Sequence, residues 1–235
     1  MEKPVYPMRI NKYLALKKHS TRRGADELIS KGQVFINDRQ AVLGDKVGEK
    51  DNVEVRFRGK QKPYIYLAYN KPRGVITHSV KGGERDIKQE VAVKDVFPVG
   101  RLDKDSYGLI ILTNDGRITE RLLGPSFFHE KEYVVKTKGT INPNFKKKME
   151  AGVQIEKEKT LKCKVELMGE RIFKIILTEG KKHQIRRMCS ALFQEVEDLK
   201  RVRIMNIRLG GLESGKYRNI ESKELQTFLK SLDLV

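Results

Sequence analysis

An arginine and an aspartate two residues apart, Arg101 and Asp103, are the side chains in this sequence best placed to do chemistry. They lie in the run GRLDKDSYGLIILTNDG, residues 100–116, just before a hydrophobic segment, residues 109–113, that we predict to be a strand. A carboxylate that an arginine keeps ionised can act as a nucleophile, and a turn backed by a strand holds it rigidly. Taken alone, such a pair is more often structural, so other features must decide.

The charge of the chain narrows the class of partner. Its 235 residues include 49 Lys plus Arg against 31 Asp plus Glu, a formal net charge of +18. An excess of this size points to a polyanion, above all nucleic acid, although charge also keeps a chain soluble. No apolar run approaches the roughly 18 residues of a spanning helix, and the start MEKPVYPMRINKY has no apolar signal region. We therefore expect a cytoplasmic protein with no membrane partner.

Cysteine and histidine usage gives no sign of a metal centre. Cys163 and Cys189 are far apart, and the four histidines form no close pair. Neither pattern has the spacing of metal ligands. We expect two reduced, buried thiols and no bound metal.

Residues 8–57 have the pattern of a small separate module. Apolar residues at helical spacing predict two helices, with Ser20 or Thr21 capping the second, and alternation after them predicts short strands. Basic residues crowd the helical part, although some would face solvent in any pair of helices. They are Arg9, Lys12, Lys17, Lys18, Arg22, Arg23 and Lys31.

The run RGKQKP, residues 58–63, is polar and reads as a linker to a larger domain, residues 64–235. In that domain strands and helices mix without regular βαβ alternation, so we predict an α+β fold with a largely antiparallel sheet. Further strands are expected at 131–137, 161–167, 171–178 and 196–209, and helices at 116–123, after Asn142, at 183–193 and at 222–231.

Four runs of the sequence resemble known families. RINKYLALKKHSTRRGADELISKGQVFINDRQA resembles the S-four-type RNA-binding domain, which binds structured RNA through the basic face of its helix pair. GRLDKDSYGLIILTNDG, HEKEYVVKT and LTEGKKHQIRRMCSALFQEVEDLKRVRIMNIRLGGL resemble the RsuA-type rRNA pseudouridine synthases (RsuA, RluB, RluE and RluF) in order and spacing. The chain looks closest to the RluF branch, which acts on large-subunit rRNA. The resemblance implies an S-four-like module before a synthase domain whose mixed sheet is flanked by helices.

The resemblance also implies roles for single residues. Asp103 matches the catalytic aspartate, and Arg101 matches the arginine that enters the RNA stack where the target uridine is flipped out. Tyr133 matches the aromatic residue packed on the uracil. Arg186 matches the basic residue paired with the aspartate, and Ile185 an aliphatic pocket residue. The family needs no metal or organic cofactor.

The chemistry of uridine isomerisation suits these residue types. Extruding a base from folded RNA costs roughly a few kcal/mol. A guanidinium plane can fill the vacated space, and stacking on an aromatic face is worth about 1–3 kcal/mol per base. The N1–C1′ bond then breaks, the uracil turns over, and C5 bonds to C1′. Attack at C1′, attack at C6 and proton loss from C2′ all use an ionised carboxylate and stay open.

Several neighbouring polar residues have plainer interpretations. Arg187 points about 100° away from Arg186 on a helix, so we expect it at phosphate or solvent. His183 is predicted to bond to backbone at the helix start, with a role as a base the alternative. Asp105 is predicted to stabilise the turn, with a pair of acids formed with Asp103 the alternative. A group of strand cations is expected to contact phosphate: Lys200, Arg201 and Arg203.

The leading hypothesis is a monomeric enzyme that converts one uridine of 23S rRNA, within a structured stem-loop, to pseudouridine. Alternative substrates are small-subunit rRNA and tRNA. A non-catalytic rRNA-binding assembly factor would keep the fold without the chemistry. A nucleoside N-glycosidase would release free uracil instead.

Overall fold

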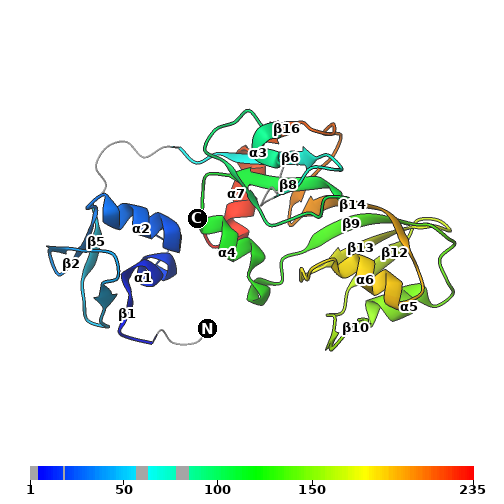
Figure 1. The fold of residues 1–235 in the computed structure, drawn as a ribbon, viewed down its shortest axis with the longest axis horizontal. Coiled ribbons are helices and arrows are strands. Elements are labelled where there is room, and N and C mark those ends of the chain that lie inside the picture. The colour runs from blue at the N-terminus through cyan, green and yellow to red at the C-terminus, as the bar shows by residue number, and fades with distance from the viewer. Residues whose placement is uncertain (1–4, 18, 57–62, 78–84) are drawn as a thin grey trace. The chain divides into compact units, whose positions relative to one another are not determined.

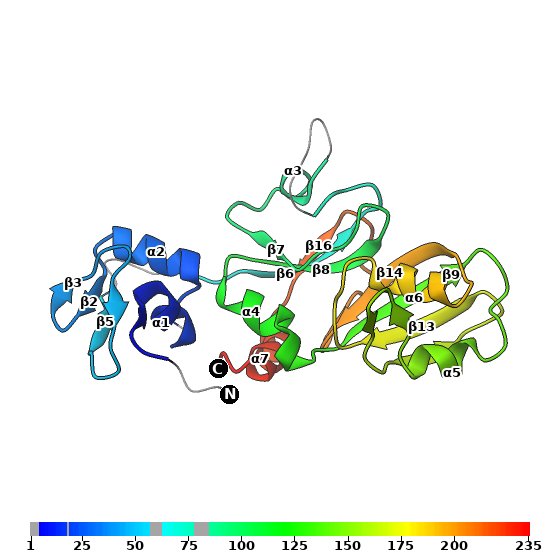
Figure 2. The same ribbon diagram turned by 60° about the horizontal axis from the view of Figure 1, so that its bottom comes forward.

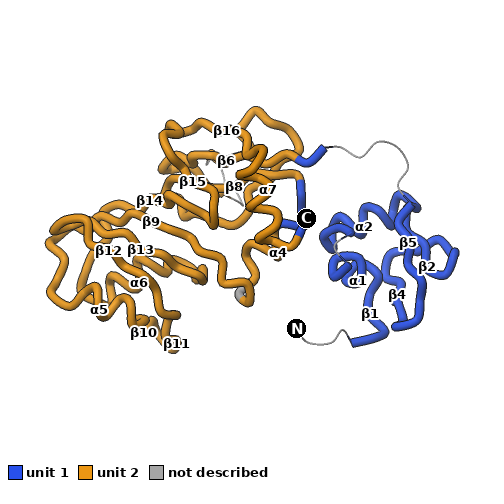
Figure 3. Tube along the Cα trace, turned by 180° about the vertical axis from the view of Figure 1, so that it is seen from behind, with its two compact units in different colours: residues 1–64, 115–118, 234 blue, residues 65–114, 119–233, 235 orange. Residues whose placement is uncertain are grey.

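The computed structural model describes residues 5–17, 19–56, 63–77 and 85–235. The chain forms two compact units (Figure 3). The first comprises residues 1–64 together with 115–118 and 234, and the second comprises the remainder. Lys18 and all of the predicted linker except Pro63 lie outside the described residues.

The first unit contains the two helices and short strands expected from its sequence pattern. Strand β1 pairs with β4, and β2 lies between β3 and β5 in a separate antiparallel sheet. The elements are β1 (Met8–Arg9), α1 (Ile10–Leu16), α2 (Arg22–Ser30), β2 (Val34–Ile36), β3 (Arg39–Gln40), β4 (Lys46–Val47) and β5 (Val53–Val55).

A capping bond starts α2, and one polar contact and one apolar cluster hold the two helices together. The hydroxyl of Thr21 accepts a hydrogen bond of 3.0 Å from the backbone N–H of Gly24, so Thr21 is the N-cap of α2. Asn11 of α1 donates to the carboxylate of Asp26 in α2 at 2.8 Å. The apolar faces of both helices pack on the strands through the buried residues Ile10, Leu14, Ala25, Ile29, Val34, Ile36, Ala41 and Val47.

The second unit is built on one mixed sheet with the order β12-β13-β9-β14-β8-β6-β16, to which β7 adds beside β8 and β15 beside β14. The β14–β8 pair is parallel and the other pairs of this sheet are antiparallel, which confirms the predicted α+β fold. The strands are β6 (Tyr66–Lys71), β7 (Phe97–Val99), β8 (Tyr107–Thr113), β9 (Lys131–Thr137), β12 (Lys164–Leu167), β13 (Ile172–Leu177), β14 (Val196–Ile204), β15 (Ile207–Arg208) and β16 (Tyr217–Asn219). A separate hairpin pairs β10 (Gln154–Ile155) with β11 (Glu158–Lys159).

Helices flank the sheet. Helix α3 lies on one side of β6 and β8, and α4 and α7 lie together on the other side (Figures 1 and 2). The helices are α3 (Ile87–Glu90), α4 (Arg117–Leu123), α5 (Phe145–Glu150), α6 (Gln184–Ala191) and α7 (Ser222–Ser231), with a short 3-10 turn at Pro125–Phe127.

Apolar side chains alternate along the strands β12, β13, β9 and β14, and α5 and α6 pack on the face of the sheet to which they point. Val135 stands opposite Phe173 on one side and Leu199 on the other, so the three side chains form a row on one face. Phe145 of α5 meets this row, with its ring centroid 5.0 Å from that of Phe173. Ile185 of α6 belongs to the same buried cluster. This packing fixes where the start of α6 lies.

Two helix starts differ from the expected ones. Asn144, with φ of 63°, precedes α5, so this helix begins later than the expected start after Asn142, whose carbonyl accepts from the N–H of Phe145 at 3.1 Å. Helix α6 begins after His183, whose φ is 51°. A left-handed residue at each position turns the chain sharply into the helix, which periodicity alone does not predict.

Candidate active site

Asp103 lies in a well-anchored turn, residues 100–106, between β7 and β8; we call it the Asp103 turn. Before it, the hydroxyl of Thr77 accepts from the N–H of Leu102 at 3.1 Å and donates to the Leu102 carbonyl at 2.8 Å. After it, the N–H of Gly74 donates to the Lys104 carbonyl at 2.8 Å. The neighbouring segment 71–77 therefore holds both flanks of Asp103.

The carboxylate of Asp103 is within reach of solvent and lies beside the imidazole of His183. Its Oδ1 lies 3.4 Å from Nε2 of His183, and the two side chains are 36% and 49% exposed respectively. His183 makes no side-chain bond to the start of α6, so the prediction that it bonds to backbone there is wrong. Asp105 is exposed and accepts no hydrogen bond from the described residues, although its charge acts on Lys71, so its role in the turn stays a prediction.

Arg186 lies in the first turn of α6, three residues after His183. Its Nη1 donates to the carbonyl of Val196 at 3.4 Å. Within the described part of the chain, no ion pair joins it to Asp103. The structure thus places Arg186 in α6, whose preceding residue His183 lies beside Asp103. The guanidinium of Arg186 makes one long hydrogen bond, to Val196.

Tyr133 stands in β9 between Ile175 of β13 and Arg201 of β14. It is partly buried and packs against the cluster that contains Ile185. Ile185 itself is buried in that cluster and has almost no exposed surface.

Arg201 is a buried structural cation. Its side chain is on a strand flanked by β9 and β8, and the residue is only 4% exposed. Nε donates to the Leu109 carbonyl at 2.7 Å, and Nη1 donates to the carbonyl of Arg101 at 3.3 Å. The prediction that Arg201 contacts phosphate is therefore wrong. Its bonds tie the Asp103 turn and β8 to β14.

The other two strand cations differ from each other. Arg203 is buried and pairs with Glu132 at 2.7 Å and Glu130 at 3.0 Å, so its predicted phosphate contact is also wrong. Lys200 is partly exposed, with its ammonium 5.8 Å from the ring centroid of Tyr107. Lys200 remains available to an anionic ligand.

Lys71, at the end of β6, is a site residue that the sequence patterns did not reveal. It has no exposed surface, and its ammonium donates to the carbonyls of Pro72 at 2.9 Å and Val75 at 2.7 Å. Burial lowers the pKa of Lys71 to about 8, while the negative charge of Asp103 opposes that shift. A lysine at the end of a strand that begins with four apolar or aromatic residues was the available signal.

Arg101 is exposed beside Asp103, and its carbonyl accepts a hydrogen bond from Arg201. Its guanidinium has no carboxylate partner among the described residues. Arg187, by contrast, pairs with Glu156 at 2.7 Å. The Arg101 guanidinium is therefore available to a ligand that binds beside Asp103.

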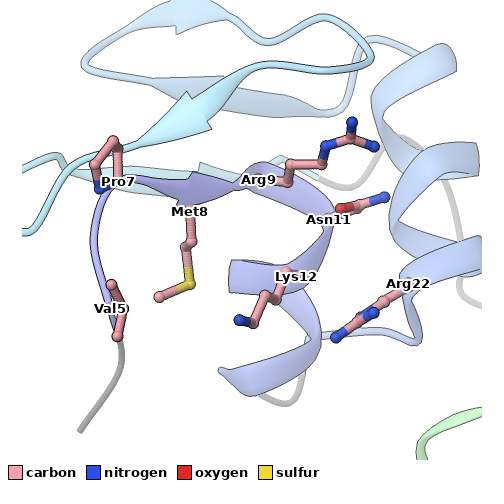
Figure 4. Close-up of a pocket in the computed structure, with 7 residues that line it drawn as sticks. All are labelled: Val5, Pro7, Met8, Arg9, Asn11, Lys12 and Arg22. Carbon is pink, nitrogen blue, oxygen red and sulfur yellow. The ribbon is translucent and has the colours of Figure 1, made fainter.

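The first unit carries a cationic surface of its own. Five exposed side chains form no ion pair within the residues that the structure describes; we call them the helix-pair cations: Arg9, Lys12, Lys17, Arg22 and Arg23. On the strand side of the unit, the two arginines are instead paired, Arg39 with Asp45 at 2.8 Å and Arg56 with Asp38 at 3.0 Å. Arg9, Lys12 and Arg22 line a hollow of about 400 Å³ (Figure 4). Uncompensated charge beside a hollow suits a phosphate backbone.

Two searches of the described ranges were negative. Nowhere in 5–17, 19–56, 63–77 or 85–235 do three His, Cys, Asp or Glu side chains gather so that they could hold a metal ion. No helix in these ranges has both the length and the apolar character needed to cross a bilayer.

Known proteins match both units. Residues 65–191 match the family described as RNA pseudouridylate synthase, and residues 8–53 match the S4 domain. The dual-specificity RNA pseudouridine synthase RluF of Escherichia coli strain K12 is 39% identical, over 98% of this chain and 81% of its own. The ribosomal large subunit pseudouridine synthase B of Bacillus subtilis strain 168 is 33% identical, over 93% of this chain and 94% of its own.

A solved structure agrees with these matches. A crystal structure of a pseudouridylate synthase superposes with a TM-score of 0.70 at 27% sequence identity. The superposition covers 96% of this chain and 99% of that one. Both units of the chain thus have counterparts in one solved protein.

Proposed function

Because this chain belongs to the RNA pseudouridylate synthase family and is an RNA pseudouridine synthase, we propose that it isomerises one uridine of large-subunit ribosomal RNA. The observation that carries the proposal is Asp103, a partly exposed carboxylate held by bonds on both flanks of its turn. The relative from Bacillus subtilis is named for the large ribosomal subunit, which supports this substrate over small-subunit rRNA or tRNA.

In the proposed reaction the chain's residues divide the work. Arg101, exposed next to Asp103, enters the RNA stack and takes the place of the extruded uridine. Tyr133 covers the uracil and is held by the buried cluster that contains Ile185. The N1–C1′ bond breaks and the C5–C1′ bond forms, while N1 gains a proton and the proton on C5 leaves. Asp103 supplies the negative charge that this exchange requires.

Arg186 is proposed to balance the charge of Asp103 once the uridine is bound. In the free protein Nε2 of His183 lies 3.4 Å from Oδ1 of Asp103. The single bond of Arg186 to Val196 is long at 3.4 Å and therefore weak, so a uridine in the site could draw the guanidinium toward Asp103. His183 then holds the carboxylate only in the absence of RNA.

The first unit is proposed to bind the RNA outside the target nucleotide. We assign residues 8–57 to this RNA-binding domain, 58–63 to the linker and 64–235 to the catalytic domain. The helix-pair cations support the assignment because no carboxylate of the described residues neutralises them. The protein is proposed to act as a monomer, in the cytoplasm where ribosomal RNA folds, and without a cofactor.

The proposal is tested by mapping pseudouridines with carbodiimide in rRNA from cells with and without the gene. Loss of one signal in 23S rRNA, restored by the purified enzyme on the same RNA, is the expected result. Loss of a signal in 16S rRNA or tRNA instead would overturn the large-subunit assignment. An unchanged map would favour a binding-only protein, and free uracil in the in vitro reaction would favour a glycosidase.

A further inference from the structure

We propose that Asp198 is a positioning residue for Asp103, acting through Arg73 and Tyr107. This inference rests on the proposed function, because it takes Asp103 to be the reacting carboxylate. Asp198 lies in β14, outside the Asp103 turn and outside the residues that the reaction uses directly.

One carboxylate joins two separate segments at this point. Oδ2 of Asp198 accepts a hydrogen bond of 2.6 Å from the hydroxyl of Tyr107. Oδ1 pairs with the guanidinium of Arg73. That guanidinium also lies over the Tyr107 ring, 5.2 Å from its centroid. The three side chains form a closed cluster from β14, β8 and the 71–77 segment.

Both segments lead directly to Asp103. Tyr107 begins β8, four residues after Asp103 in the chain. Arg73 precedes Gly74, whose N–H holds the carbonyl of Lys104, the residue after Asp103. A shift of either segment would therefore move the backbone that aims the Asp103 carboxylate.

Neither stability nor RNA affinity explains this carboxylate. Its side chain is 30% exposed and that of Arg73 is 51% exposed, and ion pairs this open to water add little stability. A negative charge beside Lys200 and Arg73 would also repel phosphate and cancel their attraction for RNA. Orientation is the remaining benefit, because the Tyr107 hydroxyl bond to a charged acceptor is short and directional.

The test compares Asp198→Asn and Tyr107→Phe with the control Glu197→Gln. Glu197 precedes Asp198 in the same strand and pairs with Lys136 at 2.7 Å and Arg171 at 2.6 Å, away from the cluster. The assay is a single turnover on the mapped rRNA fragment with saturating enzyme, together with the RNA dissociation constant and the melting temperature of each variant.

Asp198→Asn and Tyr107→Phe are expected to slow the single turnover about 10- to 100-fold, as misplacement of a reacting group by about 1 Å does. RNA affinity should stay the same or become tighter for Asp198→Asn, because a negative charge is lost. The melting temperature and the rate of Glu197→Gln should remain at the wild-type values. Asp198→Asn and Tyr107→Phe should lower the melting temperature only modestly, since each weakens or loses one part-buried hydrogen bond. The double variant should be no slower than the slower single variant, because both changes break one link.

Wild-type rates in both variants would overturn the inference, as would a rate loss that saturating enzyme restores. A Glu197→Gln enzyme as slow as Asp198→Asn would overturn it too. If Asp198→Asn does not fold, Tyr107→Phe decides, since it removes one hydroxyl and keeps the ring. Asp103→Asn is measured alongside: an active Asp103→Asn enzyme refutes the proposed function, whereas an inactive one beside a fully active Asp198→Asn refutes only the positioning.

Discussion

Replacing Lys71 with methionine should change how the stability of the protein depends on pH. Lys71 has no exposed surface, and its pKa is lowered to about 8, chiefly by burial. A free lysine has a pKa of about 10.4. The difference corresponds to about 3 kcal/mol of unfavourable free energy for holding the charge inside the folded protein.

The direction of the effect follows from proton binding. Below about pH 8 the folded and unfolded chains both hold the Lys71 proton, so the cost of the buried charge is present in full. Between about pH 8 and pH 10.5 the folded chain loses this proton while the unfolded chain keeps it. The free energy of unfolding therefore rises with pH, by about 2 kcal/mol between about pH 7 and pH 9.5.

Urea unfolding followed by circular dichroism at these two pH values measures the rise, and Lys71→Met should lack it. The variant also loses the donor to the carbonyls of Pro72 and Val75, but that loss does not depend on pH. Asp103→Asn should move the wild-type rise to lower pH, because Asp103 raises the pKa of Lys71; Asp105→Asn should move it less. An equal rise in wild type and Lys71→Met would refute a buried charge at this position.

Three further changes test other parts of the molecule. Thr21→Ala should destabilise α2 by about 1 kcal/mol, seen as faster amide hydrogen exchange in that helix, because the N-cap hydroxyl is lost. Gly108→Ala should cost about 2 kcal/mol or more in urea unfolding, because its φ is 102° and a Cβ would come within 2.3 Å of a β14 carbonyl. Arg9→Gln with Lys12→Gln should reduce the salt dependence of RNA binding by up to about two charges, whereas the paired Arg39→Gln should leave it unchanged.

Much of the fold could be predicted because burial repeats along these elements. The strand predicted at 109–113 is the buried core of β8, and that at 131–137 coincides with β9. Alternation around 168–169 likewise predicted the β12–β13 pair. The periodicity of apolar residues indicates which face of each helix or strand is buried, and this information was sufficient to predict the α+β class.

Buried charges were the main failure of the sequence interpretation. Arg201 was expected at phosphate because arginines are usually solvated, but β14 lies between β9 and β8 and buries the side chain. The order of the strands in the sheet decides whether this side chain is buried, and that order cannot be inferred from one sequence. Lys71 was missed for the same reason.

The candidate site depended on local geometry as well as on residue type. His183 has a left-handed backbone conformation before α6, which turns its ring to Asp103 in place of the expected Arg186. A shift of one residue in a helix start changes which side chain faces a neighbour, since successive residues point about 100° apart. Residue type and spacing singled out Arg101 and Asp103, but their roles, and Tyr133 altogether, came only from the resemblance of whole runs.

The most direct test of the account is tritium release from rRNA that carries 5-tritiated uridine, because C5 must lose its hydrogen when it bonds to C1′. Asp103→Asn should lower the single-turnover rate by more than about 1,000-fold while RNA binding is kept. Asp105→Asn, two residues away and exposed, should retain the wild-type rate. Release at the wild-type rate by Asp103→Asn would contradict the central claim that this carboxylate performs the chemistry.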